Sequence, residues 1–227
     1  SNSPSPTPLA VHNHAISALS VSHHGQWLVA AGFEEKLRVY RIEDRQVAFE
    51  LECPCSDLRA VAISRDDRYL AAAGRNGVVR VWELTTGTVC AEVQAHRQRV
   101  RCLTFDADGG RLISGGEDRT LRIWNWQTDG QVATLPSSTA KVLTLALCGP
   151  QLLASAGSDN TVRLWDLAGR REVEQLVGHA GSVAAMDFEN GILVSGGYDN
   201  ALRMWSIAEQ PGEPLRSARR LGLGNGE

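Results

Sequence analysis

The sequence predicts an all-β protein made of five copies of one four-stranded unit. The first indication is a repeated segment, because the stretch LASAGSDNTVRLWD at residues 153–166 recurs four more times with the same order of residue types. The second is regular spacing, since the aromatic residues that close the five segments lie 42, 42, 41 and 40 residues apart. The closing residues are Tyr40, Trp82, Trp124, Trp165 and Trp205. The third is that short apolar runs fill each period and leave no room for helices.

Four strands can be placed in each period, in the same order. An alternating apolar run such as VRCLTFD (100–106) comes first, followed by a turn such as DADGG and then by the repeated segment, which supplies two strands. A β-prone run such as EVEQLV (172–177) closes the unit and leads to Gly178 and His179. Short connections between successive strands favour antiparallel pairing, so each unit is predicted to be a four-stranded meander.

Small and polar residues recur in register within these units. A glycine stands eight residues before each closing aromatic, and the five are Gly32, Gly74, Gly116, Gly157 and Gly197. An arginine stands two residues before it, and the five are Arg38, Arg80, Arg122, Arg163 and Arg203. A residue type that every unit keeps is typical of packing within the unit, so these arginines are expected to lie along the sheets and not to bind a ligand.

This pattern resembles the WD40 repeat over residues 9–210, since the period and the Gly-His, Ser, Asp and Trp positions recur together. The resemblance implies a β-propeller built of four-stranded antiparallel blades. Residues 1–8 are rich in Ser and Pro and are expected to be a linker or a tag remnant. Residues 211–227 are a weak match to an outer strand, or a tail, and Leu9–Val11 are an alternative source of that strand.

The resemblance also implies a structural role for the Ser, His, Asp and Trp positions. In the family these side chains form a buried hydrogen-bond chain, and complete sets occur in units three and five: His96, Ser114, Asp118, Trp124 and His179, Ser195, Asp199, Trp205. A Ser-His-Asp hydrolase site is the alternative, but it needs an exposed nucleophile and an oxyanion hole, and catalytic sets rarely repeat at a period of about 40 residues. No catalytic residue is therefore expected, and the protein is predicted not to be an enzyme.

Units one and two lack the serine, because Ala30 and Ala72 occupy its place, and Pro54 replaces the histidine of unit two. We expect these two blades to depend more on apolar packing and to open first. Amide hydrogen exchange should therefore show the fastest exchange in the strands of units one and two. Uniform protection across all five blades would contradict this expectation.

Composition restricts the class of protein further. A hydrophobic fraction of 43% with 22 glycines in 227 residues suits a turn-rich domain with a substantial core, and no apolar run approaches the length of about 20 residues that spans a bilayer. The net charge of −3 argues against nonspecific nucleic-acid affinity.

Five cysteines, of which Cys90, Cys102 and Cys148 lie on strand patterns, suggest a reducing and thus cytoplasmic location. A metal or redox role is an alternative for Cys53 and Cys55, but their spacing is not a usual zinc pattern, and we expect no metal and no cofactor.

A basic rim is predicted at one entrance of the propeller, where WD40 proteins commonly bind peptides. The rim residues flank the start of each inner strand or precede each turn acid, and they are Arg59, Arg75, Arg97, Arg99, Arg101 and Lys141, flanked by Phe33 and Tyr198. Only Asp57 and Glu117 oppose them in charge. The rim suits an acidic or phosphorylated peptide, although a solvated rim whose arginines pair with local carboxylates is an equal alternative.

The predicted function is therefore a non-enzymatic protein-protein interaction or scaffold module with a protein or peptide partner. The alternatives are a regulatory domain cut from a larger signalling protein, a propeller enzyme, or a nucleic-acid binder that uses the same rim. Seven blades are the commonest number in the family, and only five units are visible, so the sequence does not decide whether the blades form a closed ring. The five units form a compact ring, an arc completed by another chain or copy, or a piece of a longer protein, and the last is slightly favoured.

Overall fold

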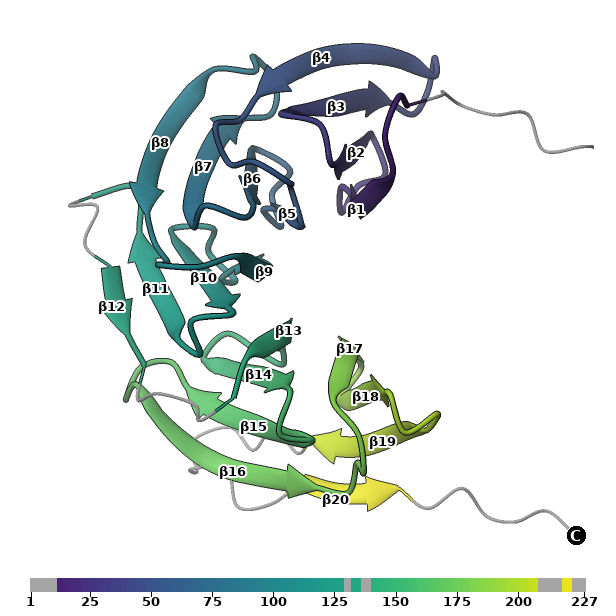
Figure 1. Cartoon of the computed structure of the whole chain (residues 1–227), viewed down its shortest axis with the longest axis vertical. Helices are drawn as coiled ribbons and strands as arrows, with labels where there is room; N and C mark the ends of the chain where they lie inside the picture. The colour runs from purple at the N-terminus through teal and green to yellow at the C-terminus, as the bar shows by residue number, and fades with distance from the viewer. Residues whose placement is uncertain (1–11, 129–131, 136–139, 208–217, 222–227) are drawn as a thin grey trace, which may run out of the picture.

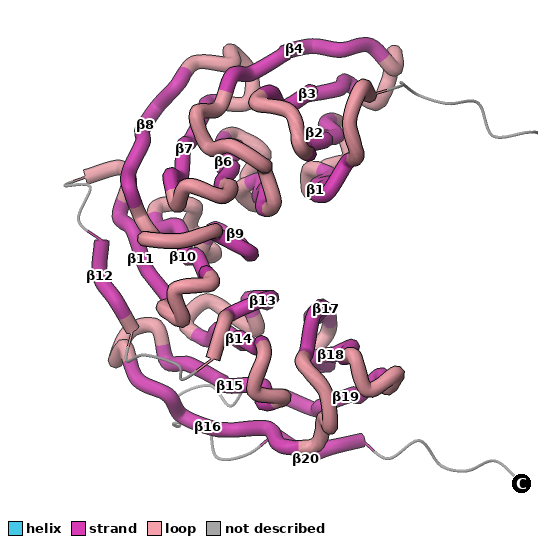
Figure 2. Tube along the Cα trace, in the orientation of Figure 1, coloured by secondary structure: helices cyan, strands magenta, loops and turns pink. Residues whose placement is uncertain are grey.

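The computed structural model describes residues 12–128, 132–135, 140–207 and 218–221. These residues form five four-stranded antiparallel sheets, which we call blades 1 to 5 in chain order. Figure 1 shows the blades arranged around a centre like spokes, and Figure 2 shows only strands and loops in the described chain. The predicted all-β propeller architecture is confirmed.

Each blade runs from the centre outward in sequence order (Figure 1). The innermost strands are β1 (Ile16–Val21), β5 (Ala60–Ile63), β9 (Val100–Phe105), β13 (Val142–Leu147) and β17 (Val183–Glu189). The second strands are β2 (Trp27–Gly32), β6 (Tyr69–Ala73), β10 (Arg111–Gly116), β14 (Leu152–Gly157) and β18 (Ile192–Gly197). The third strands carry the closing aromatics and are β3 (Lys36–Arg41), β7 (Val78–Glu83), β11 (Leu121–Asn125), β15 (Thr161–Asp166) and β19 (Leu202–Ile207). The outer strands are β4 (Gln46–Glu52), β8 (Val89–Gln94), β12 (Val132–Thr134), β16 (Arg171–Val177) and β20 (Ala218–Leu221).

The outer strand of blade 5 comes from the C-terminal part of the chain. β20 pairs with β19 in the register Met204 to Leu221 and Ile207 to Ala218. Leu9–Val11, the other predicted source of this strand, lie outside the described residues, as do residues 1–8. The blade that ends the chain is therefore a complete four-stranded sheet.

The hydrophobic core lies between the blades. Trp82 and Leu70 of blade 2 share a buried cluster with Leu37 and Val39 of blade 1. Each other pair of neighbouring blades forms a similar cluster of aliphatic residues around a buried tryptophan. Trp82 and Trp165 are each only 1% exposed. Burial of such side chains contributes about 1.5–3 kcal/mol each, and a single small sheet could not bury both of its faces alone. The repeat is therefore stable only because its neighbours cover it.

The five blades form an open arc. β1 packs beside β5, β5 beside β9, β9 beside β13, and β13 beside β17. Blades 1 and 5 face one another across an opening between β1 and β17 (Figure 1). A compact ring of five blades, one of the arrangements that the sequence left open, is therefore not what the structure shows.

Candidate functional site

A chain of polar side chains joins two strands and two loops of the fifth repeat, with Ser195 on β18, Trp205 on β19, and His179 and Asp199 in the loops before β17 and β19. The indole Nε1–H of Trp205 donates to Ser195 Oγ at 2.9 Å, Ser195 Oγ lies 2.8 Å from His179 Nε2, and His179 Nδ1 lies 3.0 Å from Asp199 Oδ1. Indole only donates and carboxylate only accepts, so the polarity of the chain is fixed at Trp205 and at Asp199. The backbone N–H of Ala180 and the His179 imidazole hold the pKa of the Asp199 carboxyl well below its usual range.

The corresponding chain in blade 3 is incomplete. His96 Nδ1 lies 2.9 Å from Asp118 Oδ1, and His96 Nε2 lies 2.7 Å from Ser114 Oγ. Trp124 Nε1, however, is buried and finds no hydrogen-bond partner among the residues that the structure describes. The expected four-membered set therefore stops at Ser114 in this blade. Burial lowers the pKa of His96 against the opposing effect of Asp118, so the ring is neutral near pH 7.

Blades 1 and 4 contain shorter versions of the chain. In blade 4, Trp165 Nε1 donates to Ser155 Oγ at 2.8 Å, while Ser138, at the histidine place, lies outside the described residues. In blade 1, where Ala30 replaces the serine, the Tyr40 hydroxyl lies 2.8 Å from His12 Nε2. Sequence comparison of the units did not reveal this direct link. The tyrosine hydroxyl bonds directly to the histidine, so blade 1 is more polar inside than the missing serine suggested.

The two serines of the Ser-His-Asp sets are not accessible to a substrate. Ser195 is 0% exposed and Ser114 is 4% exposed, and each hydroxyl is engaged by the histidine of its own blade. A nucleophilic serine must be open to the carbonyl that it attacks. The geometry of both sets therefore suits a stabilising role within the blades.

The predicted basic rim lies at one edge of the sheets, around the inner strands of blades 2 to 4. Arg59, Arg99 and Lys141 directly precede β5, β9 and β13, while Arg75 and Glu117 follow β6 and β10. In an antiparallel pair the start of the first strand lies beside the end of the second, so both kinds of position share an edge. The fold therefore brings together side chains that are far apart in the sequence.

Three guanidinium groups and two carboxylates form a continuous charged row on this edge. Asp57 Oδ2 lies 3.7 Å from Arg75 and 3.6 Å from Arg99, and Glu117 Oε1 lies 3.6 Å from Arg99 and 3.5 Å from Arg101. All four separations exceed that of a charge-assisted hydrogen bond, about 2.7–2.9 Å. The row links blades 2 and 3 through loose ion pairs. These arginines therefore pair with local carboxylates, which was the alternative to peptide binding. The loose pairs leave N–H groups of the guanidinium groups free to bind another acceptor.

The remaining rim residues differ in their surroundings. The guanidinium carbon of Arg59 lies 4.3 Å from the centre of the Phe33 ring, which joins blades 1 and 2 in a cation–π contact. Arg97 and Lys141 are exposed, and within the described chain neither side chain takes part in an ion pair. Tyr198 is 74% exposed at the end of β18 in blade 5, and in the described residues it makes no cation–π contact with the rim. Phe33 therefore contacts one rim residue, Arg59, whereas Tyr198 makes no such contact in the described residues.

Comparison with known families identifies the repeat. Five successive segments match the WD40 family described as "WD domain, G-beta repeat", at residues 5–41, 45–83, 87–125, 130–166 and 170–206. The chain belongs to the WD40 family. WD40 domains are in general protein-interaction scaffolds, and this domain has the sheets that such a scaffold requires.

One relative of this WD40 domain is the Mitochondrial division protein 1 of Mycosarcoma maydis, which is 39% identical over 62 residues. The matched part is 27% of this chain and 8% of that protein. The likeness therefore extends over the length of about one and a half repeats.

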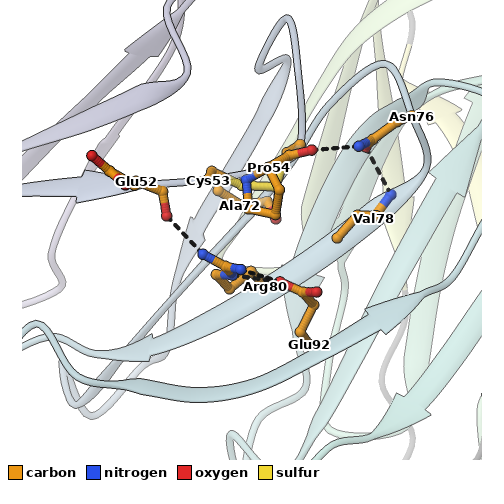
Figure 3. The surroundings of a disulfide bond; sticks show 9 residues. Glu52, Cys53, Pro54, Ala72, Asn76, Val78, Arg80 and Glu92 are labelled. Atoms are coloured by element: carbon orange, nitrogen blue, oxygen red, sulfur yellow. Dashed lines mark hydrogen bonds and ion pairs between the residues drawn. A yellow bond between two sulfur atoms is a disulfide. The ribbon is translucent and has the colours of Figure 1, made fainter.

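Cys53 and Cys55 form a disulfide in the turn between β4 and β5 of the WD40 domain (Figure 3). They lie 5.0 Å apart at Cα and are 2% and 0% exposed, inside the core between blades 1 and 2. Pro54, at the histidine place of this repeat, accepts a hydrogen bond at its carbonyl from the Asn76 amide, and Asn76 Oδ1 accepts one from Val78 N at 3.1 Å. A covalent bond and backbone contacts therefore replace the polar chain in blade 2.

The disulfide changes the interpretation of the cysteines. Disulfides are rare in cytosolic proteins, so this bond counts against the cysteine-based argument for a reducing compartment, and a cytoplasmic location stays a prediction. In the described part of the chain no three His, Cys, Asp or Glu side chains gather in a way that could hold a metal ion. The described segments also contain no helix with the length and apolar character needed to cross a membrane.

Proposed function

We propose that this WD40 domain is a non-enzymatic interaction module that binds an acidic or phosphorylated segment of a partner protein at the basic rim. The observation that carries the proposal is the charged row from Arg75 through Asp57, Arg99 and Glu117 to Arg101. The six rim cations outnumber the two carboxylates, Asp57 and Glu117, which pair with three of them, although the whole chain has a net charge of −3. The rim is therefore a local positive region on an acidic protein.

The loose ion pairs favour exchange with a ligand. Exposed ion pairs contribute about 0–1 kcal/mol, whereas a bidentate hydrogen-bonded pair between arginine and carboxylate or phosphate is considerably stronger. A phosphate between Arg99 and Arg101, which are 24% and 33% exposed at their side chains, would gain short hydrogen bonds at the expense of weak contacts with Glu117. The Phe33–Arg59 pair at the same edge of the sheets offers an aromatic and cationic surface to further ligand residues.

The Arg99→Ala/Arg101→Ala double variant should raise the Kd for an Asp- and Glu-rich peptide by about tenfold or more, and for its phosphoserine form by more than that. Fluorescence polarisation with labelled peptides measures both constants. The control is Arg41→Ala/Arg171→Ala, which removes the same charge from exposed arginines outside the rim. An unchanged Kd in the rim variant, or no binding of either peptide to the unmodified chain, would refute the proposal.

A single-stranded oligonucleotide serves as the probe for the nucleic-acid alternative. A steep fall of its affinity with salt, together with peptide binding weaker than oligonucleotide binding, would overturn the peptide proposal in favour of a nucleic-acid partner. Affinity purification with the intact chain followed by mass spectrometry would then name the partner protein. Partners that bind equally to the chain and to the rim variant would also contradict the proposal.

A further inference from the structure

The disulfide between Cys53 and Cys55 lies beside the charged row of the basic rim. Asp57, which pairs with two arginines of the row, follows Cys55 by two positions. Ser56 and Asp57 both have left-handed backbone conformations, with φ of 45° and 40°. Residues with a Cβ atom rarely adopt this conformation, and it persists only where the surroundings enforce it. The disulfide therefore anchors one end of the turn that carries Asp57.

Blade 2 holds the other side of this turn through its backbone. Arg75 N donates to Ser56 O at 2.7 Å. An ideal Cβ at Gly74 would lie 2.1 Å from Ser56 O and 2.4 Å from Cys55 O, so glycine is needed for the turn to come this close. Arg75 contacts the turn with its backbone and pairs with Asp57 through its side chain. A shift of the turn therefore changes the ion pair.

One sulfur of the disulfide has a route to the outside. Cys53 borders a hollow of about 380 Å³ between blades 1 and 2, and two glutamates and the cations Lys36 and Arg80 supply its charged lining (Figure 3). Cys53 is 2% exposed, whereas Cys55 is 0% exposed and packs in the core. Cys55 Sγ lies 3.9 Å from Ala72 O, which can accept the S–H of a reduced Cys55. A small thiol can therefore reach Cys53, and the core has an acceptor for the thiol that Cys55 becomes.

We propose that Cys53 and Cys55 form a reversible thiol–disulfide exchange site for a small thiol, and that their redox state controls the affinity of the basic rim for an acidic ligand. The second part rests on the function proposed for the rim. In the disulfide state the turn holds Asp57 between Arg75 and Arg99, where it competes with the ligand. In the dithiol state the turn relaxes, Asp57 withdraws, and both guanidinium groups are free to bind carboxylates or a phosphate.

The exchange takes two steps. The thiolate of the small thiol attacks Cys53 Sγ, the bond between the two protein sulfurs breaks, and Cys55 leaves as a thiolate that takes up a proton. A second thiolate attacks the sulfur of the small thiol in the mixed disulfide and frees Cys53, which is protonated in turn. Two small thiols are thereby oxidised to one disulfide, while the protein disulfide gains two electrons and two protons. The reverse reaction with the small disulfide restores the bond between Cys53 and Cys55.

Loss of the disulfide leaves the blades folded. A bond that closes a ring of three residues constrains the unfolded chain less than one that closes a long loop, so its contribution to the stability of the whole domain is small. Leu58, which follows the turn, is 0% exposed, and its carbonyl accepts a hydrogen bond from Ser17 Oγ. These contacts remain in both redox states. The change on reduction is therefore local to residues 53–57.

The test incubates the full chain with reduced or oxidised glutathione as the thiol probe. Acid then stops the exchange, the chain is unfolded, and mass spectrometry maps the cysteines that iodoacetamide alkylates. Reduced glutathione should make Cys53 and Cys55 available for alkylation while the tryptophan fluorescence of the incubated chain stays that of the folded state, and oxidised glutathione should protect both. Cys55→Ser should retain one glutathione on Cys53. The amide N–H of Arg75 should exchange with solvent about tenfold faster or more in the dithiol state.

The Kd of an Asp- and Glu-rich peptide should fall about threefold or more on reduction, because the weak pairs with Asp57 no longer compete. Cys53→Ser/Cys55→Ser should bind like the reduced chain under both conditions. Asp57→Asn should bind the peptide equally tightly with and without the disulfide. The control is Cys90→Ser, which removes an exposed free thiol outside the turn and should retain the full response.

Reduction by glutathione only after the chain unfolds would overturn the exchange site. Equal exchange of the Arg75 amide and an equal Kd in the two states would overturn its coupling to the rim, while the rim retains its ligand. A third result separates the two proposals. If neither state binds the peptide although the cysteines exchange and the Arg75 amide responds, the function of the rim and the effect on affinity fail together, and the exchange site stands.

Discussion

Gly157→Ala should lower the free energy of unfolding by about 3 kcal/mol or more, because its methyl group would be placed on a fixed backbone carbonyl. An ideal Cβ at Gly157 lies 1.7 Å from Lys141 O and 2.8 Å from Lys141 C. Since Ser158 N donates to the same carbonyl at 3.1 Å, the carbonyl cannot turn away without the loss of a hydrogen bond. β13 and β14 shift register at this point, which brings the two backbones together.

Urea unfolding of the chain and its variant measures the loss, and Gly110→Ala is the matched control. Gly110 lies in a turn of blade 3, where an added Cβ meets only Gln127 Oε1, at 3.5 Å. That variant should change the free energy of unfolding by less than about 0.5 kcal/mol. Equal effects of the two substitutions would show that the glycine eight residues before each aromatic has no special spatial role.

The repeat made the fold predictable. Each period contains its own turn glycines and acids and its own closing aromatic, so the strands could be placed without knowledge of the neighbouring blades. The glycine at Gly157 could be found in the same way, because it recurs in all five units. Period and register thus indicated both the blades and the edge at which Arg75 and Arg99 share the carboxylate of Asp57.

Features that depend on one blade only were not predictable. Tyr40 replaces a tryptophan and Ala30 replaces a serine in the same unit. Only the distance of 2.8 Å between the Tyr40 hydroxyl and His12 Nε2 shows that the tyrosine reaches the histidine without the serine between them. Trp124 matches the repeat in sequence, yet its indole N–H has no partner in the described chain. The disulfide between Cys53 and Cys55 likewise depends on the local path of a turn. The repeat register predicts which residues of the five units correspond to one another. A hydrogen bond also requires two atoms to be placed to within less than an ångström, and the register does not determine that placement.

The sequence predicted only in general terms that an unclosed arc exposes an apolar blade face at each end. Leu202 fits the repeat as well as Val162 does, and nothing in the pattern distinguishes a covered position from an uncovered one. Burial in a repeat protein is a property of the neighbouring unit and not of the residue itself. The number of units therefore decides the exposure of Leu202, and the structure was needed to show it.

Ser195→Ala should lower the free energy of unfolding by about 2–6 kcal/mol, since it removes one hydroxyl that serves two buried groups. Ser195 is 0% exposed, accepts from Trp205 Nε1 at 2.9 Å and is hydrogen-bonded to His179 Nε2 at 2.8 Å. Alanine leaves both groups buried without a partner, and each such group costs about 1–3 kcal/mol. Urea unfolding of the chain and the variant measures the difference.

Ser114→Ala is the matched control in blade 3, because Ser114 serves His96 alone while Trp124 Nε1 already lacks a partner in the described structure. Its loss should be smaller than that of Ser195→Ala by about 1–3 kcal/mol, the contribution of one buried group. Equal losses would mean that the indole of Trp205 gains nothing from the serine. In that case the bond between Ser195 and His179 would stabilise blade 5, and packing alone would hold the tryptophan.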